Sequence, residues 1–249
     1  MFNNKDLERY SRQIVLKKVG ILGQKKIYNS KVLVVGCGGL GTPVIDLLSR
    51  AGVGEIGMMD HDKVSMSNLH RQVIFTSDDV GKYKVSILKK KISKINKNVK
   101  VKIYRDKAED KNLGKILKQY DIIVDGTDNF KAKFLLNKFS LKYKKKLIIG
   151  AISKFEGHIF TFDFNLKKSP CLKCFYQGEP SEGVLDCETD GILGSTAVVT
   201  GSLQANEVLK AILNVGKNLN SHILIIDLLN LKFRKVLFKK RKGCICENI

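Results

Sequence analysis

Short apolar runs alternate with longer amphipathic stretches along this chain of 249 residues. The run KVLVVG at 31–36 is apolar and β-branched, which is typical of a strand buried on both faces of a parallel sheet. A glycine-rich turn follows it, then a helical stretch at 42–52 and a second strand at 55–60 that ends on an acidic residue. These segments predict a βαβ unit.

The alternation continues and then changes in the last third of the chain. Periodicity predicts, in this order, helix 81–95, strand 99–104, helix 113–120 and strand 121–126. Beyond the apolar run at 147–152, two further strands are predicted at 158–164 and 222–228, with little helix before the first of them. We therefore predict an α/β, Rossmann-like fold whose central sheet is mixed but mainly parallel.

The composition adds a strong positive charge to this picture. The 45 lysines and arginines exceed the 24 acidic residues by 45 − 24 = 21, enough to attract acidic partners over long range. The lysines are scattered along the chain, so we interpret them as a solvated surface and do not expect nucleic acid as a partner. No apolar run approaches the ~18 residues of a membrane span, and the opening residues are polar, so we expect a cytoplasmic protein with no membrane partner.

The glycine turn after the first strand has the spacing of a nucleotide-binding motif. Gly36, Gly38 and Gly41, with Gly39 between them, occur where a strand ends and a helix begins, a setting in which backbone N–H groups receive phosphates. Asp60 closes the next strand, where a carboxylate can accept hydrogen bonds from a ribose. The pattern predicts a bound adenosine nucleotide but leaves open whether it is ATP or a dinucleotide.

Polar residues that follow favour ATP. Asn68, Arg71 and Lys84 form a polar and cationic set suited to a triphosphate. Asp128 follows the predicted strand at 121–126, at the edge where ligands of open α/β sheets bind, and a carboxylate there can hold magnesium.

Several motifs together resemble the ThiF/MoeB family, relatives of ubiquitin-activating enzymes. They cover nearly the whole chain: RYSRQI (9–14), GCGGLGTP (36–43), AGVGEI (51–56), SNLHRQ (67–72), DGTDN (125–129) and CLKC (171–174). The resemblance implies an adenylyltransferase that uses magnesium and ATP to convert the Gly-Gly carboxylate of a ubiquitin-like sulfur-carrier protein into an acyl adenylate, releasing pyrophosphate. We prefer a ThiS-type carrier of thiamine biosynthesis, and a MoaD-type carrier of molybdopterin biosynthesis is the alternative.

The resemblance also implies roles for single residues. The glycine turn and Asp60 would bind the nucleotide. Its phosphates would be bound by Asn68, Arg71 and Lys84. Asp128 would bind magnesium and contact the reacting phosphate. Arg12, in the RYSRQI motif, would reach the phosphates bound by the neighbouring protomer of a homodimer. A cysteine desulfurase or another sulfur donor is a further expected partner.

The six cysteines point to metal or thiol chemistry rather than to disulfides. In the family, two CxxC pairs form a structural zinc site, and here Cys171 and Cys174 match the first pair. The second pair is shortened to Cys244 and Cys246, so the expectation is zinc, with free thiols as the alternative. Cys187 resembles the sulfur-handling cysteine of the family, although its surroundings are acidic and it could be inert.

These considerations predict one ThiF/MoeB-type domain over 1–249. Its parts are a helical segment at 1–30, a nucleotide-binding core at 31–152 and a mixed-sheet, cysteine-containing part at 153–249. Two rivals stay open at this point. The glycines and Asp60 would also suit an NAD-dependent oxidoreductase, and the charge of +21 would suit a nucleotide-sensing or nucleic-acid-binding module.

Overall fold

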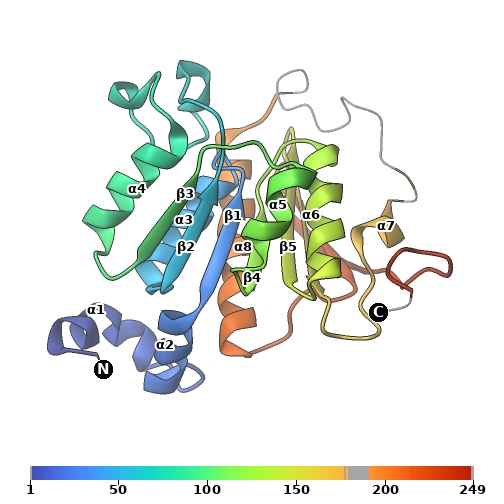
Figure 1. Ribbon diagram of the computed structural model, residues 1–249, viewed down its shortest axis with the longest axis horizontal. Coiled ribbons are helices and arrows are strands. Elements are labelled where there is room, and N and C mark those ends of the chain that lie inside the picture. Colours follow the sequence, from blue (N-terminus) through green and yellow to red (C-terminus); the bar gives the residue numbers. More distant parts are fainter. Residues whose placement is uncertain (1, 177, 179–190, 248–249) are drawn as a thin grey trace.

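The computed structural model describes residues 2–176, 178 and 191–247 and contains one eight-stranded sheet with helices on both faces (Figure 1). The strand order is β3-β2-β1-β4-β5-β6-β7-β8. The first five strands in this order are parallel, and the pairs β5/β6, β6/β7 and β7/β8 are antiparallel. The predicted mixed, mainly parallel α/β sheet is thus confirmed.

The strands are short in the parallel half and longer at the junction with the antiparallel half. Their bounds are β1 Lys31–Val35, β2 Glu55–Met59, β3 Lys100–Tyr104, β4 Ile122–Asp125, β5 Lys146–Ser153, β6 Glu156–Asp163, β7 His222–Asp227 and β8 Lys232–Leu237. The helices are α1 Asn4–Ile14, α2 Gly20–Asn29, α3 Gly41–Ala51, α4 Lys84–Ile95, α5 Asp110–Leu117, α6 Phe130–Lys142, α7 Leu172–Phe175 and α8 Gly194–Leu213. None of the described helices combines the length and apolar character that a membrane crossing requires.

Strand β1 shows why the sheet is covered on both faces. Its residues alternate between two separate hydrophobic clusters. Val32 and Val34 pack on the side of α3, α4 and α8, whereas Leu33 and Val35 pack on the side of α5 and α6. A strand that is apolar at every position can be buried in this way only between two layers of helices.

Several elements differ from the sequence predictions. The N-terminal helical segment is broken at 15–19 into α1 and α2, and α5 begins three residues before the predicted start at 113. Periodicity did not reveal α6, α8 or the edge strand β8. In α8 the buried positions include polar residues such as Thr196, Thr200 and Gln204, which hides the apolar stripe that a pattern search needs.

The sheet order reverses between β1 and β4, the two central parallel strands. From β1 the chain moves outward through β2 to β3 and then returns to β4 on the other side. Open α/β sheets bind ligands at such a switch point, at the carboxyl ends of the strands. The glycine turn follows β1, and the DGTDN turn follows β4, so both motifs lie at this one position.

Helix α1 is attached at the opposite end of the sheet. Buried Asn96 donates hydrogen bonds to the Tyr10 hydroxyl at 2.8 Å and to the Ser49 carbonyl at 2.9 Å. Gln13 donates to the carbonyl of Ala51, the last residue of α3, at 3.2 Å. Helix α1 is therefore fixed to the C-terminal end of α3, whereas the glycine turn is at the N-terminal end of that helix.

Candidate active site

The turn after β1 is packed directly against the turn after β4. Gly36 has a φ of +85°, and a Cβ added to it would lie 2.7 Å from the carbonyl carbon of Gly126. A Cβ added to Gly41 would lie 2.0 Å from the Gly36 carbonyl oxygen. Side chains at these positions are thus excluded, and the N-terminus of α3 is placed close to the end of β4.

Asp60, directly after β2, uses both carboxylate oxygens to fix the glycine turn. Its Oδ2 accepts a hydrogen bond from the Cys37 amide at 2.7 Å, and its Oδ1 accepts one from the Asp62 amide at 2.8 Å. Burial raises the pKa of the Asp60 carboxyl, whereas the Lys84 ammonium and these hydrogen bonds lower it in part. Each oxygen retains a lone pair with which it can accept a ribose hydroxyl.

Lys84, the first residue of α4, is directed toward the same place. Its side chain is only 7% exposed, and its Nζ lies 2.9 Å from Oδ2 of Asp62. Asp62 was not singled out from the sequence, although its position two residues after Asp60 is a usable signal. It holds the ammonium group beside the predicted ribose site.

Arg71 and Asn68 belong to one turn that covers the glycines. The stem of Arg71 lies about 3.5 Å from where a Cβ of Gly39 would be, and its guanidinium donates to the Ser67 carbonyl at 3.0 Å. The Asn68 side chain accepts from the Ser65 amide at 3.3 Å, so in this structure it caps a turn.

Gln72, missed by the sequence analysis, also belongs to this turn. It is buried beside Gly38, and its Oε1 is without a hydrogen-bond partner among the described residues.

Asp128 lies in the turn after β4 and is exposed. Its Oδ1 accepts a hydrogen bond from the Asn129 side chain at 3.1 Å. Asn129 in turn caps α6 by accepting from the Ala132 amide at 2.9 Å. The acid therefore faces solvent next to the glycine turn.

Arg12 is the one predicted nucleotide-site residue that lies elsewhere. It is exposed in the last turn of α1, next to Gln13, whose side chain contacts Ala51. The eleven residues of α3 separate Ala51 from Gly41, a distance of about 15 Å along the helix axis. An arginine side chain does not span that distance, so Arg12 does not reach the nucleotide site of its own chain.

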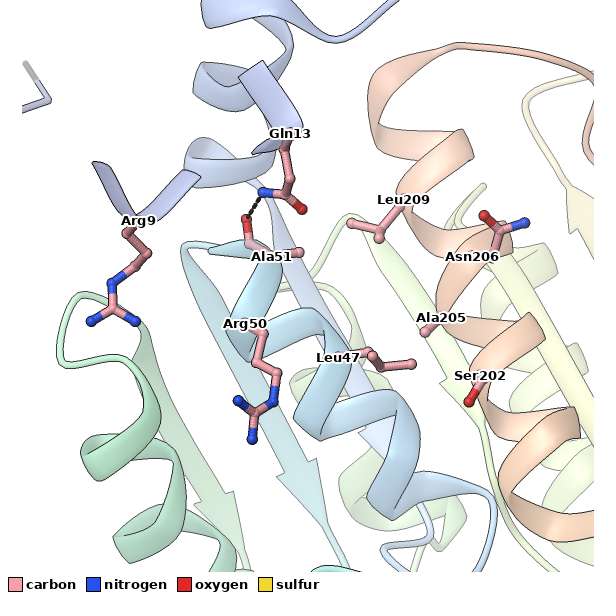
Figure 2. A pocket seen from close by; sticks show the side chains of 9 residues that line it. All are labelled: Arg9, Gln13, Leu47, Arg50, Ala51, Ser202, Ala205, Asn206 and Leu209. Carbon is pink, nitrogen blue, oxygen red and sulfur yellow. Dashed lines mark hydrogen bonds between the residues drawn. The ribbon is translucent and has the colours of Figure 1, made fainter. Parts of the chain in front are cut away.

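A groove of about 390 Å³ lies between α1, α3 and α8, and Gln13, which follows Arg12 in the sequence, lines it (Figure 2). Figure 2 shows Leu47 and Leu209 directed into it from α3 and α8, with polar side chains around them. Its lining consists of Arg9, Gln13, Leu47, Arg50, Ala51, Ser202, Ala205, Asn206 and Leu209.

The four clustered cysteines meet in one place. The sulfurs of Cys171 and Cys244 are 3.6 Å apart and those of Cys174 and Cys246 are 3.4 Å apart, and all four sulfurs lie within 4.8 Å of one another. These separations are far longer than a disulfide bond of about 2.05 Å. The shortened CxC pair is accommodated by a turn in which Gly243 has a φ of +70°.

The remaining two cysteines are Cys37 and Cys187. Cys37 is buried in the glycine turn, and burial raises the pKa of its thiol well above the ordinary value, as expected for a small packed side chain rather than a reactive thiol. Cys187 lies outside the described residues.

The residues at the switch point can hold a nucleotide and oppose the charge of its phosphates. Backbone amides of the glycine turn, the carboxylate of Asp60 and the cations of Arg71 and Lys84 come from four different segments and converge there. Asp128 adds a carboxylate with free lone pairs at the edge of the same position.

Comparison with known proteins agrees with this arrangement. Residues 10–247 match the ThiF family. The chain is 38% identical to "Sulfur carrier protein adenylyltransferase" of Thermus thermophilus, over 98% of this chain and 91% of that protein. It is 39% identical to "Adenylyltransferase and sulfurtransferase MOCS3" of Culex quinquefasciatus over 97% of this chain, but spans only 55% of that longer protein.

A third relative and two solved structures extend the comparison. "Probable molybdopterin-synthase adenylyltransferase" of Gracilaria tenuistipitata var. liui is 37% identical over 92% of this chain and 64% of its own length. E. coli MccB with MccA-N7isoASN has a TM-score of 0.84 and 25% identity, covering 99% of this chain and 76% of that one. MccB with ATP, at 24% identity and a TM-score of 0.82, covers 100% of this chain and 83% of that one and shows the shared fold.

The family match covers nearly all of the sequence, and the Thermus relative aligns over almost its whole length as well. The chain belongs to the ThiF family.

Proposed function

We propose that this protein uses ATP to adenylate the C-terminal Gly-Gly carboxylate of a ubiquitin-like sulfur-carrier protein. The observation that carries the proposal is the convergence of Asp60, Lys84 and Arg71 on the glycine turn, with Asp128 beside it. A dehydrogenase would need the first of these but not the cations. The names of the relatives support an adenylyltransferase, a nucleotidyltransferase activity.

In this reaction the carrier carboxylate attacks the α-phosphorus, and the bond to the β-phosphate breaks as pyrophosphate leaves. The carboxylate is already ionised at neutral pH, so no general base is needed. Asp60 fixes the ribose, and the turn amides with Asn68 receive the phosphates. Arg71 and Lys84 oppose the negative charge that develops on the phosphate oxygens without a large rearrangement. These residues position the reactants and reduce their mutual repulsion.

Asp128 fits a magnesium ion of the kind that is bound mainly by phosphates. Mg²⁺ is commonly held by one or two carboxylates together with substrate phosphates and water. The Asp128 carboxylate is exposed and has one hydrogen bond from Asn129, so it has lone pairs to offer. Magnesium would supply charge neutralisation at the triphosphate.

The cysteine cluster fits a structural zinc ion, and we include zinc in the proposal. Tetrahedral zinc with Zn–S bonds of about 2.3 Å places sulfurs about 3.8 Å apart, close to the 3.4 and 3.6 Å seen for two pairs. The Arg241 amide also donates to the Cys174 sulfur at 3.4 Å, as expected for a thiolate ligand. Such a site would join α7 to the C-terminal turn.

The homodimer is proposed because Arg12 is too far from its own nucleotide site. A second copy seated on the groove between α1, α3 and α8 would cover Leu47 and Leu209 and bring Arg12 of one chain toward the phosphates bound by the other. In a twofold-symmetric dimer, the commonest closed arrangement, each chain can offer its Arg12 to the other, so this is the arrangement we expect.

The proposal also concerns the type of carrier protein that is adenylated. We favour a ThiS-type carrier, and the relatives named MOCS3 and molybdopterin-synthase adenylyltransferase favour the MoaD-type alternative. Cys187 remains our proposed sulfur-handling residue on sequence grounds alone, with a cysteine desulfurase or another donor as its source. A cytoplasmic location agrees with these partners.

We predict that ATP–pyrophosphate exchange requires magnesium and a carrier that ends in Gly-Gly. Purified ThiS-type and MoaD-type carriers, each with a variant that lacks the last glycine as control, are compared in the same exchange measurement. The preferred carrier identifies the pathway. Exchange without any carrier would contradict the proposal, and tight NADH binding without ATP binding would favour an oxidoreductase.

Asp128→Ala is expected to reduce carrier-dependent exchange by about 10²-fold or more, the scale of losing one electrostatic group that acts on the transition state. Asp110→Ala, at an exposed acid on α5, is the matched control and is expected to leave exchange unchanged. Near-normal exchange in the Asp128 variant would remove this residue from the mechanism.

Mixing Arg12→Ala protein with Asp128→Ala protein should restore activity. Random reassortment makes half of the dimers mixed, and each mixed dimer has one intact composite site, so recovery of roughly one quarter of wild-type activity is expected. Each variant alone, and the two variants mixed without subunit exchange, are the controls. No recovery after demonstrated exchange would show that the site is not shared.

Metal analysis of protein purified without chelators should find about one zinc ion per chain, the stoichiometry of a closed four-ligand site. Cys246→Ser is expected to lower the zinc content and the melting temperature, whereas Cys37→Ala, outside the cluster, should retain zinc. Stably folded wild-type protein without metal would show that these cysteines act as free thiols.

A further inference from the structure

A buried polar network lies beneath the DGTDN turn, and the reaction proposed above does not use it. The side chains of Lys133 and Asp125 are 2% and 0% exposed. The Lys133 ammonium donates to the Thr127 carbonyl at 2.8 Å and to the Gly150 carbonyl at 2.6 Å, and it lies 3.4 Å from Oδ2 of Asp125. One cation from α6 thus joins the end of β4 and the middle of β5 to the turn between β4 and α6.

Asp125 completes the network from the other side. Its Oδ1 accepts hydrogen bonds from the amide and the hydroxyl of Thr127, at 2.8 and 2.7 Å. Its backbone carbonyl accepts from the side chain of buried Gln204 in α8 at 2.9 Å. Thr127 is therefore held at its amide, its hydroxyl and its carbonyl.

The carbonyl that Lys133 holds belongs to the peptide bond between Thr127 and Asp128. On the other side of Asp128, Asn129 is fixed as the N-cap of α6. The Asp128 side chain itself is exposed and contacts only the neighbouring Asn129 among the hydrogen bonds described. The direction of its carboxylate consequently depends on the backbone on both sides, and one of those two attachments is Lys133.

A buried ion pair is a poor means of adding stability, because desolvation of the two charges offsets much of their attraction. Such a pair is better suited to fixing one geometry. Lys133 lies one helical turn into α6, and its ammonium reaches back to the DGTDN turn that precedes the helix. It therefore braces the DGTDN turn against α6. The residue it orients is the one proposed to face magnesium and the reacting phosphate.

We propose that Lys133 is a positioning residue for adenylation, which holds the Thr127–Asp128 peptide so that the Asp128 carboxylate is directed at magnesium-bound ATP. This inference rests on the proposed function. A positioning role differs from a purely structural role in one respect. Removal of the Lys133 ammonium must change how ATP binding responds to magnesium, and not only the stability of the fold.

The test uses three variants of the full chain. The first is the double variant Lys133→Met/Asp125→Asn, which removes both charges together, because Lys133→Met alone would leave Asp125 buried and unpaired and can fail to fold. Lys133→Arg keeps the cation. Lys138→Met, at an exposed lysine on the same helix, is the matched control.

Two measurements need no carrier. Amide hydrogen exchange reports whether the 126–130 turn has loosened relative to the rest of α6. Magnesium titration of ATP binding reports whether the carboxylate is still directed at the ion. In the double variant we expect faster exchange confined to the turn and a magnesium requirement raised about tenfold, the usual scale for losing a group that orients a metal ligand. ATP affinity without magnesium should change less than roughly threefold, as expected when Asp60, Lys84 and Arg71 are intact.

Lys133→Arg should recover most of the magnesium response, and Lys138→Met should match wild type. A folded double variant with wild-type magnesium dependence would overturn the proposal, whether or not its turn exchanges faster. Failure of the wild-type protein to exchange pyrophosphate with any carrier would instead overturn the proposed function. The two failures are thus distinguishable.

Discussion

The close approach of two backbone turns at the switch point determines the rest of this structure. Gly36 and Gly126 touch where β1 and β4 end, with no space for a Cβ on Gly36. This contact places the N-terminus of α3, the end of β2 and the DGTDN turn around one position. A side chain at Gly36 or Gly41 would separate the two turns and so remove the binding position itself, rather than weaken one of its interactions.

Around that contact, charged side chains are held in place by other charged groups before any ligand binds. Lys84 is paired with Asp62, and Lys133 with Asp125, and both lysines are buried. Groups that are already oriented do not need to reorganise when charge develops on a phosphate, and this is the main source of electrostatic catalysis. The cost is desolvation, and here the cost is reduced because backbone amides and carbonyls supply additional hydrogen bonds.

The sequence predicted those features that depend on local pattern. The glycine spacing, the acid after β2 and the apolar run of β1 are each readable within a few residues, and the structure brings the glycines, Asp60, Lys84, Arg71 and Asp128 to one edge of the sheet. It did not predict the Lys133 network, because these contacts join α6, β4 and β5 and produce no periodic pattern in the sequence. It also left open whether the shortened Cys244/Cys246 pair could face the first pair, because that depends on a turn with positive φ at Gly243. Arg12 was assigned to the nucleotide site of the neighbouring protomer by the family motif alone, and only the structure shows how far its helix lies from the glycine turn of its own chain.

The edge strand β8 has a consequence for how the protein behaves in solution. Lysines and an arginine interrupt its exposed apolar residues, among them Phe233 and Leu237, which are 55% and 58% exposed. Charges on an edge strand discourage pairing with the same edge of another molecule, and a net charge of +21 adds repulsion between whole molecules. That repulsion acts over about 10 Å in 0.1 M salt and over about 3 Å in 1 M salt. Concentrated salt therefore weakens this repulsion, and self-association through the β8 edge is expected to increase as electrolyte is added.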